Sequence, residues 1–525
     1  MTTPSDMHLL DLSRSPGQLA RVFRHAHEIP DSPAITYDGG ALTWAQTLDL
    51  VLRLARDLRD RGVRTGDRVA LLTTNRPEFL LTVLATWALG AITVPVNFRL
   101  TPREVAFVLD NTTPAVLLVE DRTAELATGA GEHAATAAPE VLDLDSRAYL
   151  DPATFASGPL DVLDVVVPAA ADDCAIMHTS GTTGNPKGAV LSHLNVFVCS
   201  AGVAKKWEVS SGKGVVMLAP PLFHIGTFLA SQGAIAGGGT ALVVASSGFD
   251  AAATLRTMKE HAVTAAFMVP QQWSLLCEEI DRAGGADAVG LQLGHANWGG
   301  APASAKVLDH MRAAMPHTEV KASFGQTETS GYGVGIDWED SLRKPGSVGK
   351  PADDMEVRVV DPEMNDVAPG EIGEIVYRGP GVMSRFWNNP EATAEAFAGG
   401  WFHSGDLVRR DEEGFIHVVD RLKDMIISGG ENIYCAEIEN ALTWHPDIAE
   451  VTVVGRPDPT WGEVPVACIV PQDPAAPPDL ASVRAYLKDR LASYKHPKHV
   501  HILPELPRTG VGKIHKPTLR EVVVS

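Results

Sequence analysis

The chain has 525 residues, 45% of them hydrophobic, and carries a formal net charge of −21 at pH 7. This length is too great for a single hydrophobic core, so we expect several lobes, and the composition excludes disorder as the overall state. The negative balance argues against general affinity for nucleic acids or anionic membranes. An acidic chain that binds a polyphosphate must therefore gather its positive charge locally.

The first part of the chain alternates helices and strands. Its predicted helices lie at residues 42–63 and 77–89, and its predicted strands at 68–73, 91–96 and 115–119. Thr101, with Glu104 three residues later, predicts the capped start of another helix. This alternation favours a parallel, doubly wound α/β layer. Residues 125–171 show no clear period, and we expect a surface connection there.

Further strands and helices follow this connection. A buried strand is predicted at residues 174–178, and residues 319–322 also resemble a strand. A strand that runs into a turn over residues 214–226, followed by the strand-and-loop segments 240–244 and 264–270, predicts a second α/β lobe. Short strands with Gly/Pro turns, which indicate a small β-rich lobe, lie at 355–360, 373–378 and 415–419. After a charged joint at 420–424, the predicted helices are 436–442 and 480–494, and the strands 450–454 and 465–470.

These patterns together predict an α/β protein with two domains. A large multi-lobed N-terminal domain over residues 1–422 comprises two doubly wound α/β lobes and a small β-rich lobe. A smaller α+β C-terminal domain covers residues 423–525.

The cysteines and the terminal segments indicate the cellular compartment of the protein. The five cysteines are widely spaced without a CxxC pair, so we expect reduced core residues, with neither a metal site nor a disulfide framework. No secretory signal and no apolar run of membrane-spanning length is visible. We therefore expect a cytoplasmic protein without a membrane span.

A loop of glycines and hydroxyl residues follows the predicted strand at 174–178. It reads Thr-Ser-Gly-Thr-Thr-Gly-Asn-Pro-Lys-Gly from Thr179 to Gly188. Glycines let the backbone approach a ligand closely, so N–H groups can converge on anionic oxygens, and Lys187 adds positive charge. The loop therefore predicts a phosphate cradle. The expected contacts are Thr179, Ser180, Gly181, Thr182, Thr183, Gly184 and Lys187.

This loop resembles the phosphate loop of the adenylate-forming superfamily, which includes acyl-CoA synthetases, aryl-CoA ligases, peptide-synthetase adenylation domains and luciferases. A second motif, Ser-Phe-Gly-Gln-Thr-Glu, agrees with the resemblance. The resemblance implies that Phe324 binds adenine, Thr327 the α-phosphate and Glu328 Mg²⁺. A carboxylate beside a polyphosphate needs such a bridging cation. Further ATP contacts implied by this motif and by the loop after Trp298 are Ser323, Gly325, Gln326, Gly300, Ala301 and Pro302.

Motifs in the last third of the chain extend the resemblance. Asp406, in Trp-Phe-His-Ser-Gly-Asp, matches an aspartate that accepts ribose hydroxyls, and Arg421 an arginine that reaches the ribose or phosphate. Lys423 matches the hinge about which a mobile C-terminal domain rotates. The loop Ser428, Gly429 and Gly430 matches the lining of the CoA tunnel. Lys513 matches the lysine that contacts carboxylate and α-phosphate during adenylation.

The acid pocket is encoded less clearly. His224 stands where relatives place an aromatic or histidine gate between the acyl and thiol sites, and we assign it a catalytic role by resemblance. Gly325 occupies a position that is bulky in short-acid enzymes, so acetate is not expected as the best substrate. The predicted lining residues are Phe223, His224, Val269, Trp298, Gly299, Gly325 and Tyr332.

The resemblance implies an acid–CoA ligase that uses ATP, Mg²⁺ and coenzyme A, with a medium or bulky apolar carboxylic acid as substrate. Three alternatives stay open: an adenylation enzyme that loads a carrier protein, a luciferase-like oxygenase, and a homologue that performs one half-reaction only. A homodimer, a separate carrier protein and a partner ligase also stay open as partners.

Overall fold

The structure is a computed structural model. It describes residues 15, 17–146, 148–179, 186–246, 248–301, 303–428, 431–508 and 514–524. No helix within these ranges combines the length and the apolar run that crossing a bilayer requires.

The first lobe is built on a mixed sheet, which we call the N-terminal sheet. Its strands run in the order β18 (Arg385–Phe386), β8 (Lys187–Ser192), β7 (Asp173–Thr179), β4 (Ile92–Pro95), β3 (Arg68–Leu72), β5 (Val116–Val119) and β6 (Glu140–Asp143). The strands from β7 to β6 are parallel, whereas β8 is antiparallel to β7. The helices of this part of the chain are α2 (Gln18–Glu28), α3 (Trp44–Asp60), α4 (Pro77–Ala88), α5 (Pro102–Thr112) and α6 (Asp121–Gly131).

The second lobe is built on a sheet that we call the central sheet. Its strands run in the order β15 (Lys350–Pro351), β14 (Val334–Gly335), β13 (Glu319–Phe324), β12 (His295–Gly299), β11 (Ala265–Met268), β9 (Val215–Leu218), β10 (Thr240–Val243), β1 (Pro33–Tyr37) and β2 (Gly40–Thr43). The strands from β13 to β1 are parallel. Its helices are α9 (Ala251–Glu260), α10 (Pro270–Arg282), α11 (Ala286–Val289), α12 (Ala305–Ala314) and α13 (Trp338–Arg343).

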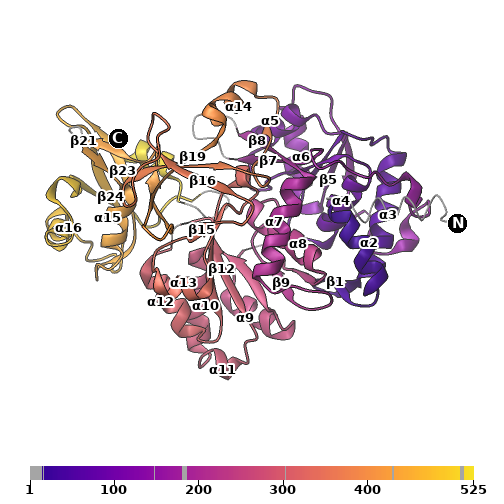
Figure 1. Cartoon of the computed structure of the whole chain (residues 1–525), viewed down its shortest axis with the longest axis horizontal. Coiled ribbons are helices and arrows are strands. Elements are labelled where there is room, and N and C mark those ends of the chain that lie inside the picture. The colour runs from indigo at the N-terminus through magenta and orange to yellow at the C-terminus, as the bar shows by residue number, and fades with distance from the viewer. Residues whose placement is uncertain are drawn as a thin grey trace.

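Two helices join these lobes. α7 (His193–Lys206) contacts β8 of the N-terminal sheet, α8 (Ile225–Gly237) contacts β9, β10 and β11 of the central sheet, and the two helices pack on each other (Figure 1). A Cβ at Gly233 of α8 would lie 2.5 Å from the Val203 side chain of α7, so this close approach requires glycine. One continuous apolar core consequently runs through both lobes.

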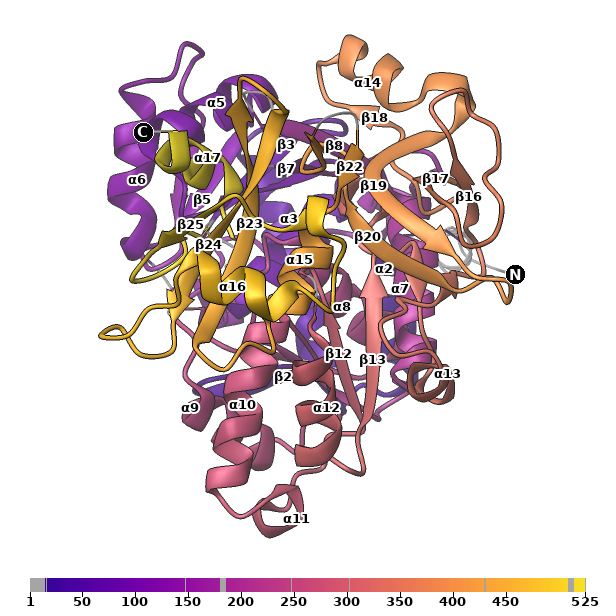
Figure 2. The ribbon, with the colours of Figure 1, turned by 90° about the vertical axis from the view of Figure 1, so that its left-hand side faces the viewer.

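The small β lobe and the C-terminal segment complete the molecule. The small β lobe is an antiparallel sheet of β16 (Glu356–Val360), β17 (Ile372–Arg378), β19 (Phe402–Arg410) and β20 (Ile416–Arg421), with α14 (Pro390–Ala396) before β19. In Figure 1 it lies between the C-terminal segment and the two α/β lobes, and in Figure 2 the C-terminal segment stands in front.

The C-terminal segment has its own sheet and cores. Its strands are β21 (Ile426–Ser428), β22 (Glu431–Ile433), β23 (Ile448–Asp458), β24 (Gly462–Pro471) and β25 (His499–Ile502), and its helices α15 (Cys435–Leu442), α16 (Leu480–Leu487) and α17 (Lys516–Val524). Two apolar clusters lie within this segment, one with members from Ile426 to Leu487 and one with members from Val454 to Val523. Both are separate from the core of the two lobes. A large mixed α/β part with a smaller α+β part confirms the predicted fold class.

Most local predictions are confirmed, and the differences have tertiary causes. The helix predicted at 42–63 begins at Trp44, because residues 40–43 pair with β1. The surface connection predicted at 125–171 contains β6, which pairs with β5, and α6 reaches into it. The helix predicted at 480–494 ends at Leu487, where the amides of Arg490 and Leu491 both bond the Leu487 carbonyl. All five cysteines are buried, which confirms their predicted place in the core.

Candidate active site

The predicted phosphate loop joins β7 to β8. Thr179 ends β7 and faces Lys187, the first residue of β8, in the antiparallel register. The Thr179 hydroxyl lies 3.3 Å from the Lys187 carbonyl oxygen and 3.4 Å from Glu328 Oε1, so it can donate to either. The Lys187 ammonium lies 5.3 Å from the centre of the Phe386 ring on β18. The β7 end of the loop is thus held beside the second motif, and the β8 end lies beside Phe386.

Glu328 lies in a 3₁₀ turn, Thr327–Thr329, directly after β13. It is 8% exposed, and its own carbonyl accepts a hydrogen bond from the Met383 amide at 2.8 Å. Burial raises the pKa of the Glu328 carboxyl, partly offset by the positive charge of Arg421. A buried carboxylate of this kind is stabilised by a cation, and Mg²⁺ combines such carboxylates with phosphate oxygens. The residues present therefore fit a magnesium ion.

The ribose motif adjoins the same turn. Gln326 Nε2 donates to the Ser404 carbonyl oxygen at 3.3 Å, and the Ser404 hydroxyl accepts from the Asp406 amide at 3.0 Å. Asp406 Oδ1 lies 3.0 Å from Arg421 Nε, which faces it in the β19–β20 register. The second motif, Asp406 and Arg421 consequently form one connected polar surface.

The proposed adenine contacts lie at two neighbouring strand ends. β12 and β13 are parallel, with Gly299 opposite Ser323, and Phe324 is half-buried at the end of β13. Ser323 Oγ accepts from Asn297 Nδ2 at 2.8 Å. Gly300, which follows β12, is exposed with φ +75°, a left-handed conformation that favours glycine. This carboxyl edge is where open parallel sheets bind their ligands.

Phe223 and His224 lie at the start of α8. The Phe223 ring meets Phe98 of the first lobe edge to face, with ring centres 5.4 Å apart. His224 is the N-cap residue of α8. A Cβ added at Gly226 or at Gly299 would lie 2.6 Å or 3.1 Å from the Phe267 ring, so this ring fills the space between α8 and β12. Phe267 was not singled out from the sequence, although strand alternation places it on the same face as Val269.

Trp298 and Tyr332 have other neighbours. Alternation along β12 turns the Trp298 side chain away from the face that carries Asn297 and Gly299. The Tyr332 ring lies against α7, with the Lys206 ammonium 5.3 Å from its centre. Phe267 thus lies between the start of α8, which follows Phe223 and His224, and Gly299, whereas the described contacts of Trp298 and Tyr332 lie elsewhere.

Gly325 has no room for a side chain. A Cβ at this position would lie 2.9 Å from the Gly333 amide nitrogen and 2.9 Å from Thr329 Oγ1. The close approach of two backbone segments therefore requires glycine here, whatever acid the pocket takes.

The predicted hinge is bonded to the last helix. Arg520 of α17 donates to the Lys423 carbonyl oxygen at 3.3 Å and pairs with Asp424 at 2.6 Å. Ser428 ends β21 and lies opposite Gly462 of β24. The predicted site residues Ser180, Gly181, Thr182, Thr183, Gly184, Pro302, Gly429, Gly430 and Lys513 lie outside the described residues, and their roles stay predictions.

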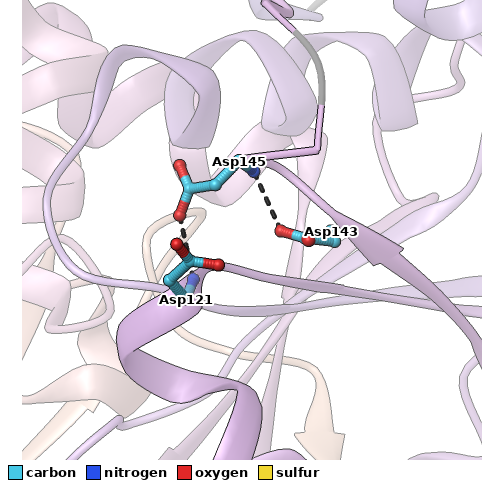
Figure 3. A group of neighbouring side chains, drawn as sticks. All are labelled: Asp121, Asp143 and Asp145. Atoms are coloured by element: carbon cyan, nitrogen blue, oxygen red, sulfur yellow. Dashed lines mark hydrogen bonds between the residues drawn. The ribbon is translucent and has the colours of Figure 1, made fainter.

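A separate group of carboxylates stands at the ends of β5 and β6. Asp121, Asp143 and Asp145 have oxygens within 4.8 Å of one another (Figure 3). The Asp121 amide donates to Asp145 and the Asp145 amide to Asp143, each at 2.9 Å, and Arg76 pairs with Asp145 at 3.0 Å. Backbone amides and a guanidinium thus already partner the carboxylates of Asp143 and Asp145, which stabilises the ends of the two strands.

The whole chain is similar to known enzymes. The sequence profile described as AMP-binding enzyme matches residues 22–387, and that of the AMP-binding enzyme C-terminal domain matches residues 437–513. A feruloyl-CoA synthase of Amycolatopsis sp is 39% identical over 95% of this chain and 97% of its own length. An indoleacetate–CoA ligase of Aromatoleum aromaticum is 37% identical over the same shares.

A solved structure agrees with these relatives. The o-succinylbenzoate CoA synthetase MenE from Bacillus subtilis, in complex with its acyl-adenylate intermediate, superposes with a TM-score of 0.84. It is 30% identical, and the match covers 96% of this chain and 98% of that one. The chain therefore belongs to the AMP-binding enzyme family, in its acyl-CoA synthetase branch.

Proposed function

We propose that this enzyme converts ATP, a bulky apolar carboxylic acid and CoA to acyl-CoA, AMP and pyrophosphate through an acyl-adenylate. The observation that carries the proposal is the connected polar surface from Thr179 through Glu328 and Gln326 to Asp406. It joins a phosphate loop, a buried carboxylate and a carboxylate suited to ribose hydroxyls. ATP, Mg²⁺ and CoA are the cofactors of this enzyme class.

The first half-reaction follows from charge. A carboxylate is a poor electrophile, because an oxide would have to leave its carbonyl carbon. Its oxygen instead attacks the α-phosphorus of ATP, the P–O bond to the β-phosphate breaks, and pyrophosphate leaves. Mg²⁺, held by Glu328, would offset phosphate charge when bound. Lys187 and Lys513 stabilise the additional negative charge on the phosphate, and Asp406 and Phe324 hold the nucleoside in place.

The second half-reaction needs a thiol. The CoA sulfur, having lost its proton, attacks the acyl carbon, and AMP leaves. We assign the thiol path to the loop at Ser428, by rotation of the C-terminal domain about Lys423. Trp461 supports this assignment: it adjoins Gly462, which faces Ser428, it is 51% exposed, and the Lys498 ammonium lies 5.9 Å from its ring. An exposed aromatic face beside a cation suits a nucleotide, whose base stacks and whose phosphates are anionic.

The acid is best described as aromatic. Three phenylalanine rings, those of Phe98, Phe223 and Phe267, lie around the start of α8 and give the expected pocket apolar, flat walls. Planar acids pack well on such faces. The names of both relatives and of the solved structure also specify acids that carry aromatic rings.

The direct test is acid-dependent ATP–pyrophosphate exchange with a panel of cinnamic, aryl-acetic, benzoic and straight-chain acids. A parallel assay measures acyl-CoA from acid plus ATP or from preformed acyl-adenylate. We expect exchange and thioester with the same aromatic acid. If the enzyme catalyses exchange but forms no thioester with CoA, a carrier protein would be the acceptor in place of CoA. If thioester forms only from the preformed adenylate, the enzyme would catalyse only the second half-reaction. Exchange with straight-chain acids only would overturn the aromatic assignment.

A further inference from the structure

A single asparagine of the first lobe holds the turn that leads to Phe223 and His224. This turn, residues 218–222, follows β9 in the central sheet. Asn75 Nδ2 donates to the Leu218 and Pro220 carbonyl oxygens at 3.1 Å and 2.9 Å. Asn75 Oδ1 accepts from the Leu222 amide at 2.7 Å. Three backbone groups of the turn are thus bonded by one amide.

The arrangement requires the chemistry of asparagine. Asn75 is 6% exposed, so these bonds lie out of water, where an unpaired backbone group is costly. A carboxamide offers two N–H donors and an acceptor at this length, whereas aspartate offers only acceptors. The Asn75 amide itself donates to Ser246 Oγ at 3.1 Å, which fixes the asparagine to the segment after β10.

The turn is anchored at its two ends and held between them by these bonds. Leu218 and Leu222 are buried in the main core, and between them the turn borders a hollow of about 50 Å³ whose lining residues include Pro220, Pro221 and Ser246. Downstream, the His224 amide donates to the Pro221 carbonyl at 3.1 Å. A displacement of the turn would therefore move the start of α8 with it.

We infer that Asn75 is a positioning residue for the acid-binding side of the active site, acting through the turn on Phe223 and His224. This inference rests on the proposed function, in which these two residues border the acid. Asn75 lies in the connection from β3 to α4, and it makes no described bond to Thr179, Glu328 or Asp406. Substitution of Asn75 should consequently change KM for the acid and not KM for ATP.

The test compares Asn75→Asp and Asn75→Ser with Asn195→Asp in the full-length enzyme. Asn195 is a matched control: it is 5% exposed, its Nδ2 donates to the Pro380 and Val382 carbonyl oxygens at 2.7 Å and 2.9 Å, and its Oδ1 accepts from the Ser192 amide at 2.7 Å. The same amide chemistry is therefore removed at a different turn. KM for the acid and KM for ATP are measured separately by pyrophosphate exchange, and folding by thermal melting.

We expect the two Asn75 variants to raise KM for the acid about tenfold, the scale of one or two lost buried hydrogen bonds, with KM for ATP changed less than about twofold. Asn195→Asp should lower the melting temperature comparably and leave KM for the acid unchanged. Equal changes in both KM values, or an equal rise of the acid KM in Asn195→Asp, would overturn the inference. Asn75→Ser retains a small polar side chain and gives the answer if Asn75→Asp does not fold. A wild-type enzyme silent with every acid would instead overturn the proposed function, and this inference with it.

Discussion

The Asp406 carboxylate and the Arg421 guanidinium face each other across the β19–β20 hairpin, with Oδ1 and Nε 3.0 Å apart. The two side chains differ in exposure, 7% for Asp406 and 47% for Arg421. The hairpin thus buries an acceptor at the site and leaves its positive partner open to solvent. Such a pair places a charged hydrogen bond at the site and leaves the guanidinium accessible to an anionic ligand.

This geometry predicts that Asp406→Asn weakens ATP binding. A hydrogen bond to a charged group contributes about 1.5–3 kcal/mol, so KM for ATP should rise about 10- to 100-fold. Asp411→Asn is the matched control: it removes a carboxylate at the other end of the same hairpin, where Asp411 pairs with Lys344 at 2.7 Å. Pyrophosphate exchange at varied ATP measures both. An unchanged KM in Asp406→Asn would remove the ribose role from this residue.

The buried carboxyl of Glu328 should lower the stability of the ligand-free enzyme although catalysis requires it. Burial raises the pKa of this carboxyl above the ordinary value of 4.5, so stability falls as the pH rises from that ordinary value to the raised pKa and stays lower above it. The favourable, protonated contribution is present at acid pH and lost as the pH rises. At pH 7 Glu328→Gln should therefore raise the melting temperature of the ligand-free enzyme by about 1–2 °C and abolish exchange.

The control for this substitution is Glu78→Gln. Glu78 is also buried, but it forms two hydrogen bonds with the Arg76 guanidinium, at 2.9 Å and 3.0 Å. Its loss leaves a half-buried cation without this partner, so the melting temperature should fall. Melting curves with and without Mg²⁺–ATP complete the test, since only Glu328→Gln should lose the stabilisation by ligand. A Glu328→Gln enzyme that melts lower than wild type would contradict the argument.

Local chemistry explains which elements could be predicted from the sequence. The helix start at Thr101 was predictable because its capping box involves residues three apart, and both bonds form: the Glu104 amide to Thr101 Oγ1 at 3.4 Å and the Thr101 amide to Glu104 Oε2 at 2.7 Å. β6 was missed because its four residues are defined by their pairing with β5, which a local pattern does not record. β19, which carries Asp406, was likewise not predicted as a strand, although it pairs on both sides.

The site follows the same rule. Thr179, Lys187, Glu328 and Asp406 could be singled out from the sequence because each lies in a contiguous motif whose residue types suit the chemistry, and their roles stay predictions. Phe267 and Asn75 were missed because single apolar or amide residues in unremarkable segments acquire a role only through neighbours distant in sequence. Alternation with Val269 was the one signal available for Phe267, and none existed for Asn75.

His193 predicts a pH dependence of stability. Burial lowers the pKa of this side chain to about 4, with a partly opposing effect of Asp172 and Asp173. Below about pH 6.5 this histidine therefore takes up a proton in the unfolded chain but not in the folded protein. The free energy of unfolding consequently falls as the pH drops from 6.5 to 4, by about 3 kcal/mol at most.

His193→Phe should reduce this fall. The ring packs edge to face on Trp87, with centres 5.6 Å apart, and phenylalanine preserves that contact without a titrating group. Because burial also lowers the pKa of His178 to about 4, the variant should lose only part of the acid sensitivity. The measurement is the melting temperature of both enzymes between pH 4.5 and 7.5. Parallel curves for the two enzymes would show that His193 does not carry the effect.

A comparison of two exposed tryptophans of the C-terminal segment tests whether Trp461 contacts CoA. Trp461 and Trp444 are both 51% exposed, but Trp461 adjoins the Ser428 strand end, whereas Trp444 precedes the opposite end of β23. Stacking of a base on an aromatic ring contributes about 1–3 kcal/mol, so Trp461→Ala should raise KM for CoA about 5- to 100-fold. Pyrophosphate exchange, which needs no thiol, should stay at the wild-type rate, and Trp444→Ala should leave both quantities unchanged. An equal effect of the two substitutions would show that Trp461 acts through the stability of the segment, and the nucleotide of CoA would then have to bind elsewhere.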